Sequence, residues 1–203
     1  MKLYYLPGAC SLASHIALRE AGAAFDLERL DKASMKTESG ADFLAINPKG
    51  YVPTLALDDG EVLTEGVAIL QYIADENPKA ALAPAAGSRA RVHLQEHLNY
   101  VSSELHKAFS PLFNPKSSEA DKAAARTNVT EKLDLVEKLL SDGRSYLVGD
   151  GFTVADAYLF VVVNWTLPTG IGLDNWPHVA AFHQRIVGRA SVQAALKAEG
   201  LAA

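Results

Sequence analysis

The sequence of 203 residues is poor in cysteine: Cys10 is the only one, which excludes an internal disulfide framework. It also lacks a run of basic residues. With 19 Lys and Arg against 24 Asp and Glu, the formal net charge is −5, whereas a nucleic-acid scaffold needs a concentrated basic face. We therefore expect no nucleic-acid partner. A small anionic ligand held by local donors is compatible with this charge.

No apolar segment is long enough to cross a membrane. The most apolar stretch covers residues 157–163, against the roughly 20 residues that a membrane-spanning helix needs. Near the amino terminus, Pro7 and Gly8 interrupt the apolar run before it reaches the length of a signal-peptide core. These absences predict a cytoplasmic protein that does not bind a membrane.

The sequence changes its pattern after about residue 79. The first part, 1–79, alternates strand and helix signals in the order βαβ then ββα, which predicts a small mixed sheet with helices packed on it. The expected strands are 2–6, 25–30, 52–57 and 61–63, and the expected helices are 11–21 and 66–75. Residues 80–87 are rich in Pro, Ala and Gly and predict a linker.

Residues 88–203 carry only helical patterns, at least four of them, and predict an all-α second domain. Thr153 and Asp156 form a capping box ahead of the apolar stretch 157–163. Pro177 suits the first turn of the next helix. The predicted fold class is thus an α+β domain followed by an all-α domain.

Cys10 stands between the Pro7-Gly8 turn and the helix expected from Ser11. A thiol at a helix N-terminus meets unpaired N–H groups and the positive end of the helix dipole, which favour a thiolate. A buried structural cysteine is an equally good interpretation of the position alone. The run from Cys10 to Ala13 resembles a C-x-x-C site without its second cysteine, so a reactive Cys10 would need an external thiol.

Two further places could bind such a ligand. Val52-Pro53 follows a glycine-containing turn at the start of a strand and is a candidate cis peptide bond. A cis bond would expose the Val52 backbone to an extended peptide ligand. An ordinary trans proline is the alternative. Glu65 and Gly66 open a helix, where a carboxylate side chain and a free N–H could hold an amino-acid zwitterion. A plain acidic first turn is the alternative there.

The helical stretch 94–109 is predicted to use three faces. The core stripe consists of Leu94, Leu98, Val101, Leu105 and Phe109, the polar face of Asn99, Ser103 and His106, and the third face of His93, His97, Tyr100 and Glu104. The polar face is either solvated or binds a ligand. His93 to His97 also match the H-x-x-E-H pattern of one class of zinc protease. Because no third ligand can be nominated, we expect two surface histidines and no metal site.

Taken together, five segments resemble the glutathione S-transferases, and more narrowly their bacterial beta class. The segments are KLYYLPGACSLASHIALREAG, NPKGYVPTL, LTEGVAILQYIAD, LNYVSSELHKAFSPLF and GDGFTVADAYLF, spread over essentially the whole chain. The resemblance implies a thioredoxin-like first domain, an all-helical second domain, and a homodimer that binds glutathione at the domain boundary. It implies glutathione as co-substrate and no tightly bound cofactor.

The resemblance also assigns roles to residues that match the family pattern. Cys10 would contact the glutathione sulfur, with Ser11 and His106 as donors to the thiolate, and Tyr5 is a rival activator. Val52, ahead of the family's cis-proline Pro53, would pair with the cysteinyl backbone. The γ-glutamyl end would meet Glu65 and Gly66, and the helical contributors, some of them reaching across the dimer, would be Asn99, Ser103, Glu104 and His106.

The sequence departs from the family pattern at two positions. Gly66 stands where many members have Ser, so a hydroxyl contact is absent. Met35 stands where beta-class relatives often have Lys, and Lys36 follows it, so either residue is a candidate at the glycyl carboxylate. Candidates for the apolar electrophile site are Phe109, Phe113 and Trp165, although each could equally be core.

The implied function is attack of the glutathione thiolate on an electrophilic, aromatic or halogenated small molecule, with thiol–disulfide exchange through Cys10 as a side activity. One alternative is a glutaredoxin-like or reductively dehalogenating enzyme in which Cys10 is an obligate nucleophile. Another is a non-catalytic protein that binds glutathione or another ligand.

Overall fold

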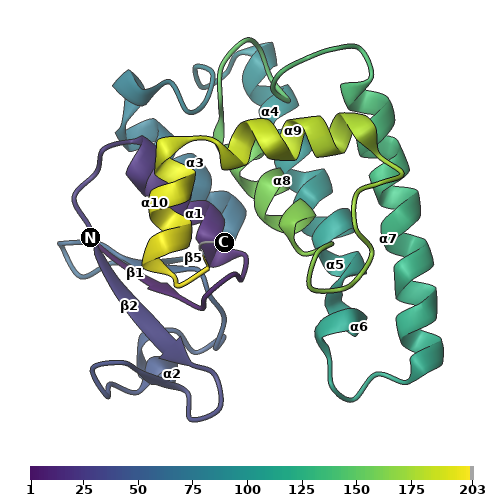
Figure 1. Ribbon diagram of the computed structural model, residues 1–203. Coiled ribbons are helices and arrows are strands. Elements are labelled where there is room, and N and C mark those ends of the chain that lie inside the picture. The colour runs from purple at the N-terminus through teal and green to yellow at the C-terminus, as the bar shows by residue number, and fades with distance from the viewer. Residues whose placement is uncertain (202–203) are drawn as a thin grey trace. The chain divides into compact units, whose positions relative to one another are not determined.

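The computed structural model describes residues 1–201 and divides into two compact units (Figure 1). The first unit contains residues 1–83 together with the segment that begins at Gly188, and the second runs from Pro84 to Val187. This division falls within the predicted linker 80–87. It also places the last segment in the first unit, whereas the sequence gives no reason to separate it from 88–187.

A five-stranded mixed sheet forms the frame of the first unit. The strands are β1 (Lys2–Tyr5), β2 (Asp26–Asp31), β3 (Lys36–Thr37), β4 (Thr54–Ala56) and β5 (Val62–Thr64), in the order β3-β2-β1-β4-β5. β1 and β2 are parallel and the other pairs antiparallel. The predicted mixed sheet is confirmed.

Helices cover this sheet, and α1 (Ser11–Glu20) lies at the centre of the unit. Every residue of α1 from Ser11 to Leu18 is buried, because the helix packs against β1, α3 (Gly66–Glu76) and α10 (Ala190–Ala198). The remaining short helices are α2 (Phe43–Ile46) and the 3₁₀ turn η1 (Pro78–Ala80). Glu20 binds Arg189 and Ser191, which fixes the start of α10 against the end of α1.

The second unit is all helical, as predicted. It contains α4 (Arg89–Tyr100), the π-helical turn η2 (Val101–Leu105), α5 (His106–Ala108), α6 (Ser110–Phe113), α7 (Glu119–Leu140), α8 (Val154–Asn164) and α9 (Pro177–Val187). α8 is buried from Val154 to Val163, and the predicted capping box of Thr153 and Asp156 begins it. α9 begins at Pro177, as predicted.

Among residues 1–201, no helix combines the length and the apolar character needed to cross a bilayer.

Candidate functional site

In the first unit, Cys10 lies at the N-cap of α1 and contacts the Val52 backbone. Its Sγ donates a hydrogen bond to Val52 O over 3.3 Å, and the side chain is partly exposed. The Val52-Pro53 bond is cis, as the sequence resemblance implies. A partly exposed thiol therefore stands beside backbone that leads into a sheet strand.

The hydroxyl of Ser11 is engaged within the loop. Ser11 Oγ accepts from Leu6 N at 3.2 Å and donates to Leu6 O at 3.3 Å, and the residue is fully buried. Of the first helical amides, Leu12 N and Ala13 N donate to Ala9 O and Cys10 O. The Ser11 hydroxyl hydrogen is thus directed to Leu6 O in this structure.

Tyr5, the rival activator, is nearly buried at the end of β1. Its ring lies 6.3 Å from that of His15, between ring centroids. Burial, reinforced by the nearby Glu199 carboxylate, raises the pKa of Tyr5 above its ordinary value. Tyr5 therefore keeps its proton at neutral pH, so it could act on a thiolate as a hydrogen-bond donor and not as a base.

Glu65 and Gly66 lie at the start of α3, beside the cis-proline. Glu65 is the N-cap, with a φ of 70°, and its exposed carboxylate accepts from Lys49 Nζ at 2.7 Å. A Cβ at Gly66 would lie 3.5 Å from Pro53 Cγ, an ordinary contact. Residues 10, 52, 53, 65 and 66, widely separated in sequence, are thus linked through these contacts into one group.

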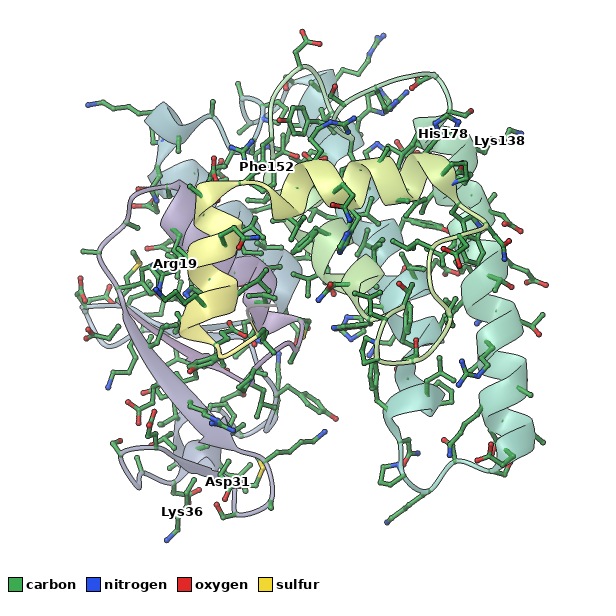
Figure 2. The ribbon with its side chains drawn as sticks, viewed as in Figure 1. Arg19, Asp31, Lys36, Lys138, Phe152 and His178 are labelled. Atoms are coloured by element: carbon green, nitrogen blue, oxygen red, sulfur yellow. The ribbon has the colours of Figure 1, made fainter. Side chains whose placement is uncertain are left out.

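Met35 and Lys36 lie on different faces. Met35 packs against the apolar cluster of Tyr4, Leu30 and Phe43, against which Val52 also packs. Lys36 is exposed in β3, where it pairs with Asp31, and both are labelled in Figure 2. The structure brings Met35, and not the Lys36 side chain, into the cluster that contains Val52.

In the second unit, His106 faces two aromatic residues of the α8 region. Its Nδ1 lies 2.7 Å from Tyr158 Oη, and its ring centroid is 4.7 Å from that of Trp165 in an edge-on arrangement. Burial, with a smaller contribution from the Lys107 charge, lowers the pKa of His106 to about 4. The imidazole is therefore neutral at pH 7 and cannot offer a full positive charge to a thiolate.

Trp165 is the centre of an aromatic group. Phe109 and Phe113 lie 5.7 Å and 5.5 Å from it, between ring centroids, both edge-on. Phe113 is 50% exposed, Trp165 is 8% exposed, and Phe109 is fully buried. The structure brings together all three residues predicted for the electrophile, but only Phe113 offers a large open surface, and Phe109 is core.

The other helical candidates are exposed. Ser103 Oγ donates to Asn99 O at 2.9 Å, so these two share a face as predicted. Glu104 binds Lys132 Nζ at 2.7 Å. His106 does not share the exposed surface of Asn99 and Ser103, because it turns toward Tyr158. All five residues of the predicted core stripe are at most 2% exposed: Leu94, Leu98, Val101, Leu105 and Phe109.

The H-x-x-E-H pattern forms a surface contact: His93 Nδ1 lies 3.1 Å from Glu96 Oε2, and both side chains are exposed. Within residues 1–201, no three His, Cys, Asp or Glu side chains gather as a metal site would require.

Sequence reasoning missed Lys49, Tyr158 and Glu199. Lys49 lies in the NPKG segment, whose residues indicate a turn and give no sign of a separate role for the lysine. Tyr158 lies in an apolar run that is typical of a helix core. Glu199 contacts His15 and Gly8, far away in sequence. No local signal could have found it.

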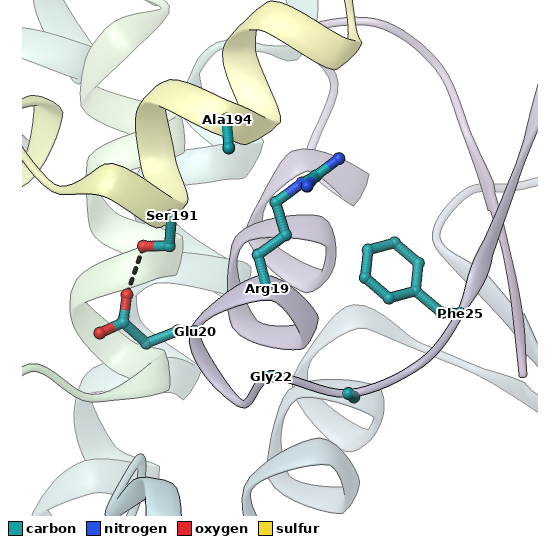
Figure 3. A pocket seen from close by; sticks show the side chains of 7 residues that line it. Arg19, Glu20, Gly22, Phe25, Ser191 and Ala194 are labelled. Carbon is teal, nitrogen blue, oxygen red and sulfur yellow. Dashed lines mark hydrogen bonds between the residues drawn. The ribbon is translucent and has the colours of Figure 1, made fainter.

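An open pocket of about 490 Å³ lies on the first unit at the opposite end of α1 from Cys10. Arg19, Glu20, Gly22, Ala23, Phe25, Ser191 and Ala194 line it (Figure 3). None of these residues belongs to the predicted site.

Comparisons with known proteins agree with this geometry. A family model described as "Glutathione S-transferase, N-terminal domain" matches residues 8–76, and one described as "Glutathione S-transferase, C-terminal domain" matches residues 100–190. Glutathione S-transferase GstA of Escherichia coli O157:H7 is 49% identical over 201 residues, covering 99% of this chain and 100% of the relative.

Two solved structures are similar over nearly the full length. The bacterial beta class glutathione S-transferase of Sphingomonas chungbukensis shares 53% identity with a TM-score of 0.96, covering 99% of this chain and 100% of that one. A sphingomonad glutathione S-transferase complexed with glutathione shares 52% identity with a TM-score of 0.96, covering 100% of both chains.

Proposed function

Because the chain belongs to the glutathione S-transferase family and to its bacterial beta class, and is therefore an enzyme that transfers glutathione, we propose that its acceptors are electrophilic small molecules of the aromatic or halogenated kind. The contact that carries the binding half of this proposal is the 3.3 Å hydrogen bond from Cys10 Sγ to Val52 O. It places a thiol beside the backbone that an extended peptide would pair with.

The ends of the tripeptide are assigned by charge. The Glu65 carboxylate suits the γ-glutamyl ammonium, and its present partner, the Lys49 ammonium, is a group of the same charge. The Gly66 N–H begins an 11-residue helix and suits the adjacent carboxylate. Met35 packs against the same apolar cluster as Val52 but carries no charge, whereas its neighbour Lys36 carries a positive charge. We propose that the glycyl carboxylate binds the Lys36 ammonium, which the long side chain allows to reach it.

The reaction that we propose is a displacement. The glutathione thiol gives its proton to solvent, the thiolate attacks the electrophilic carbon, and halide leaves with the bonding electrons. His106, neutral at pH 7, can donate Nε2–H to the sulfur when its Nδ1 accepts from the Tyr158 hydroxyl. In that tautomer the Tyr158 hydroxyl is the donor to Nδ1 and the ring hydrogen stays on Nε2. The half-exposed ring of Phe113, backed by Trp165, is the proposed surface for the apolar substrate.

Thiol–disulfide exchange through Cys10 is the proposed side activity. The Cys10 thiolate would attack the glutathionyl sulfur of a disulfide between glutathione and another thiol, forming a mixed disulfide with glutathione and releasing the other thiolate. A glutathione thiolate would then attack the mixed disulfide, restore Cys10 and release glutathione disulfide. No further reductant is needed.

The test is conjugation of glutathione to an activated aryl halide, followed by absorbance, for wild type, Cys10→Ala and Cys10→Ser. We expect conjugation to persist in Cys10→Ala while exchange disappears. Loss of conjugation in both variants would instead make Cys10 an obligate nucleophile. Tight binding to immobilised glutathione without turnover of any aryl halide by wild type would point to a non-catalytic binding protein.

We also propose a homodimer in which Asn99, Ser103 and Glu104 contribute to the partner's glutathione site. Asn99, Ser103 and Glu104 are exposed on α4 and η2, as such a role requires. Light scattering at micromolar concentration tests the assembly, and a monomer at all concentrations would contradict it.

A further inference from the structure

The loop that carries Cys10 is held by the last helix of the chain. Gly8 N donates to Glu199 Oε2 at 2.9 Å, across 191 positions of sequence. Gly8 has a φ of +70°, and the Leu201 side chain lies 3.6 Å from where a Cβ at Gly8 would stand. Because Gly8 precedes Cys10 by two residues, Glu199 contacts the backbone that sets the position of the thiol without touching the thiol itself.

The carboxylate of Glu199 is itself oriented by two residues of α1. His15 Nδ1 lies 2.8 Å from Glu199 Oε1, and Arg19 Nε donates to His15 Nε2 at 2.8 Å. An arginine Nε can only donate, so His15 Nε2 accepts and the ring hydrogen resides on Nδ1, from which it is donated to Glu199. The side chains of His15 and Glu199 are fully buried.

Packing fixes both ends of this chain of hydrogen bonds. Glu199 N donates to Ala195 O at the end of α10. The ring of Phe25 stands edge-on to His15, with centroids 5.7 Å apart, and Arg19 lies over the same ring at 5.8 Å (Figure 3). The group therefore has little freedom to rearrange.

We propose that Glu199, oriented by His15 and Arg19, is a positioning residue for Cys10. It holds the Gly8 amide, and with it the turn from Leu6 to Ser11, so that Cys10 Sγ stays against Val52 O. The inference rests on the proposed function, in which Cys10 meets the sulfur of glutathione. Its consequence is that the last helix, whose side chains lie outside the proposed substrate contacts, influences the rate of thiol–disulfide exchange through Cys10.

The test uses Glu199→Gln, which keeps the shape but has one acceptor oxygen in place of two. Whichever way the amide turns, either Gly8 N–H or the His15 Nδ1–H loses its acceptor. His15 cannot change tautomer to compensate, because Arg19 occupies Nε2. The matched control is Glu76→Gln, an exposed glutamate at the end of α3 in the same unit.

Two readouts report on position rather than on stability. The first is the rate at which iodoacetamide alkylates the single thiol, for which we expect a change of about two- to tenfold in Glu199→Gln, the equivalent of one net hydrogen bond. The second is kcat for thiol–disulfide exchange through Cys10 at saturating glutathione, for which we expect a loss of about ten- to hundredfold, as small misplacements of reacting groups cause. Glu76→Gln should match wild type in both.

A folded Glu199→Gln with wild-type alkylation rate and kcat would overturn the proposal, even if its melting temperature fell. If that variant does not fold, Arg19→Lys carries the test, since it keeps the charge but puts a methylene where Arg19 Nε donates to His15. Arg19→Lys should then change both rates in the same direction by a smaller factor, and unchanged rates would overturn the proposal. Absence of conjugation by wild type would contradict the proposed function instead, while the alkylation rates would still test the positioning.

Discussion

Replacing Asp156 by Asn should destabilise the second unit far more than the same change in a second, exposed capping box. Asp156 is fully buried at the start of α8 and accepts three hydrogen bonds, from Leu147 N at 2.8 Å, Thr153 N at 2.8 Å and Thr153 Oγ1 at 2.7 Å. Its carboxylate joins the loop before α8 to the first turn of the most buried helix of the unit.

The expected magnitude follows from counting acceptors. Asn has one side-chain oxygen, and its NH₂ group would point at either Leu147 N–H or Thr153 N–H. The Thr153 hydroxyl can rotate, but a backbone N–H cannot, so one buried donor stays unpaired at a cost of about 1–3 kcal/mol. Together with the weakened cap, we expect a loss of about 2–4 kcal/mol. For a protein of this size that corresponds to a melting temperature lower by about 5–15 °C.

Urea unfolding at pH 7.5 measures this loss. Burial raises the pKa of Asp156 to about 6 against the hydrogen bonds that lower it, so the carboxylate is ionised at that pH. The control is Asp121→Asn, in the exposed capping box with Ser118 at the start of α7. There water replaces the lost acceptor, and we expect at most about 1 kcal/mol. Equal losses in the two variants would refute the argument that burial makes the unpaired donor costly.

Three further changes give separate tests. Gly66→Ser should fold normally, since its Cβ meets Pro53 Cγ at 3.5 Å, and lower the KM for glutathione about two- to tenfold through one added hydrogen bond; an unchanged KM would contradict this. Ser11→Ala should cost about 1–3 kcal/mol in urea unfolding because it removes both bonds to Leu6, and a loss below about 0.5 kcal/mol would be too small for a paired buried hydroxyl. The folded-state pKa of His106, about 4, lies below its unfolded value of about 6.5, so its contribution to stability is present above pH 6.5 and lost as pH falls toward 4. In His106→Asn the urea midpoint should therefore fall less between pH 6.5 and pH 4 than in wild type. The same dependence on pH in both proteins would refute this prediction.

Local patterns predicted the features that depend on a few neighbouring residues. The capping box at Thr153, the helix start at Pro177 and the core stripe of α4 and η2 all follow from hydrogen-bonding groups or apolar residues within one or two turns. The elements that were missed, β3 and α2, have two and four residues. Segments so short have no detectable periodicity, and their formation depends on the strands and loops they pack against.

The sequence alone could not identify contacts between residues that are far apart along the chain. His15 lies on α1 among apolar residues, where a polar side chain could be a ligand, a surface group or a buried donor. Its burial is possible only because Glu199, 184 positions later, accepts its hydrogen. The same contact places α10 with the first unit. Helical pattern alone gives no signal for this contact, so it cannot separate the segment that begins at Gly188 from the helices before it.

His106 illustrates how regular geometry misplaces a single residue. At 100° per residue, it should share a face with Asn99 and Ser103, yet it faces Tyr158 and Trp165 while those two stay exposed. Between them, Val101–Leu105 form a π-helical turn, whose i→i+5 hydrogen bonds hold about one residue more per turn than an α-helix. The predicted core stripe nevertheless continues past this turn to Phe109, which is fully buried. His106 leaves its predicted face because it contacts Tyr158 and Trp165, residues about 50 to 60 positions later, and burial there keeps the imidazole neutral. No apolar periodicity within 94–109 reveals that contact.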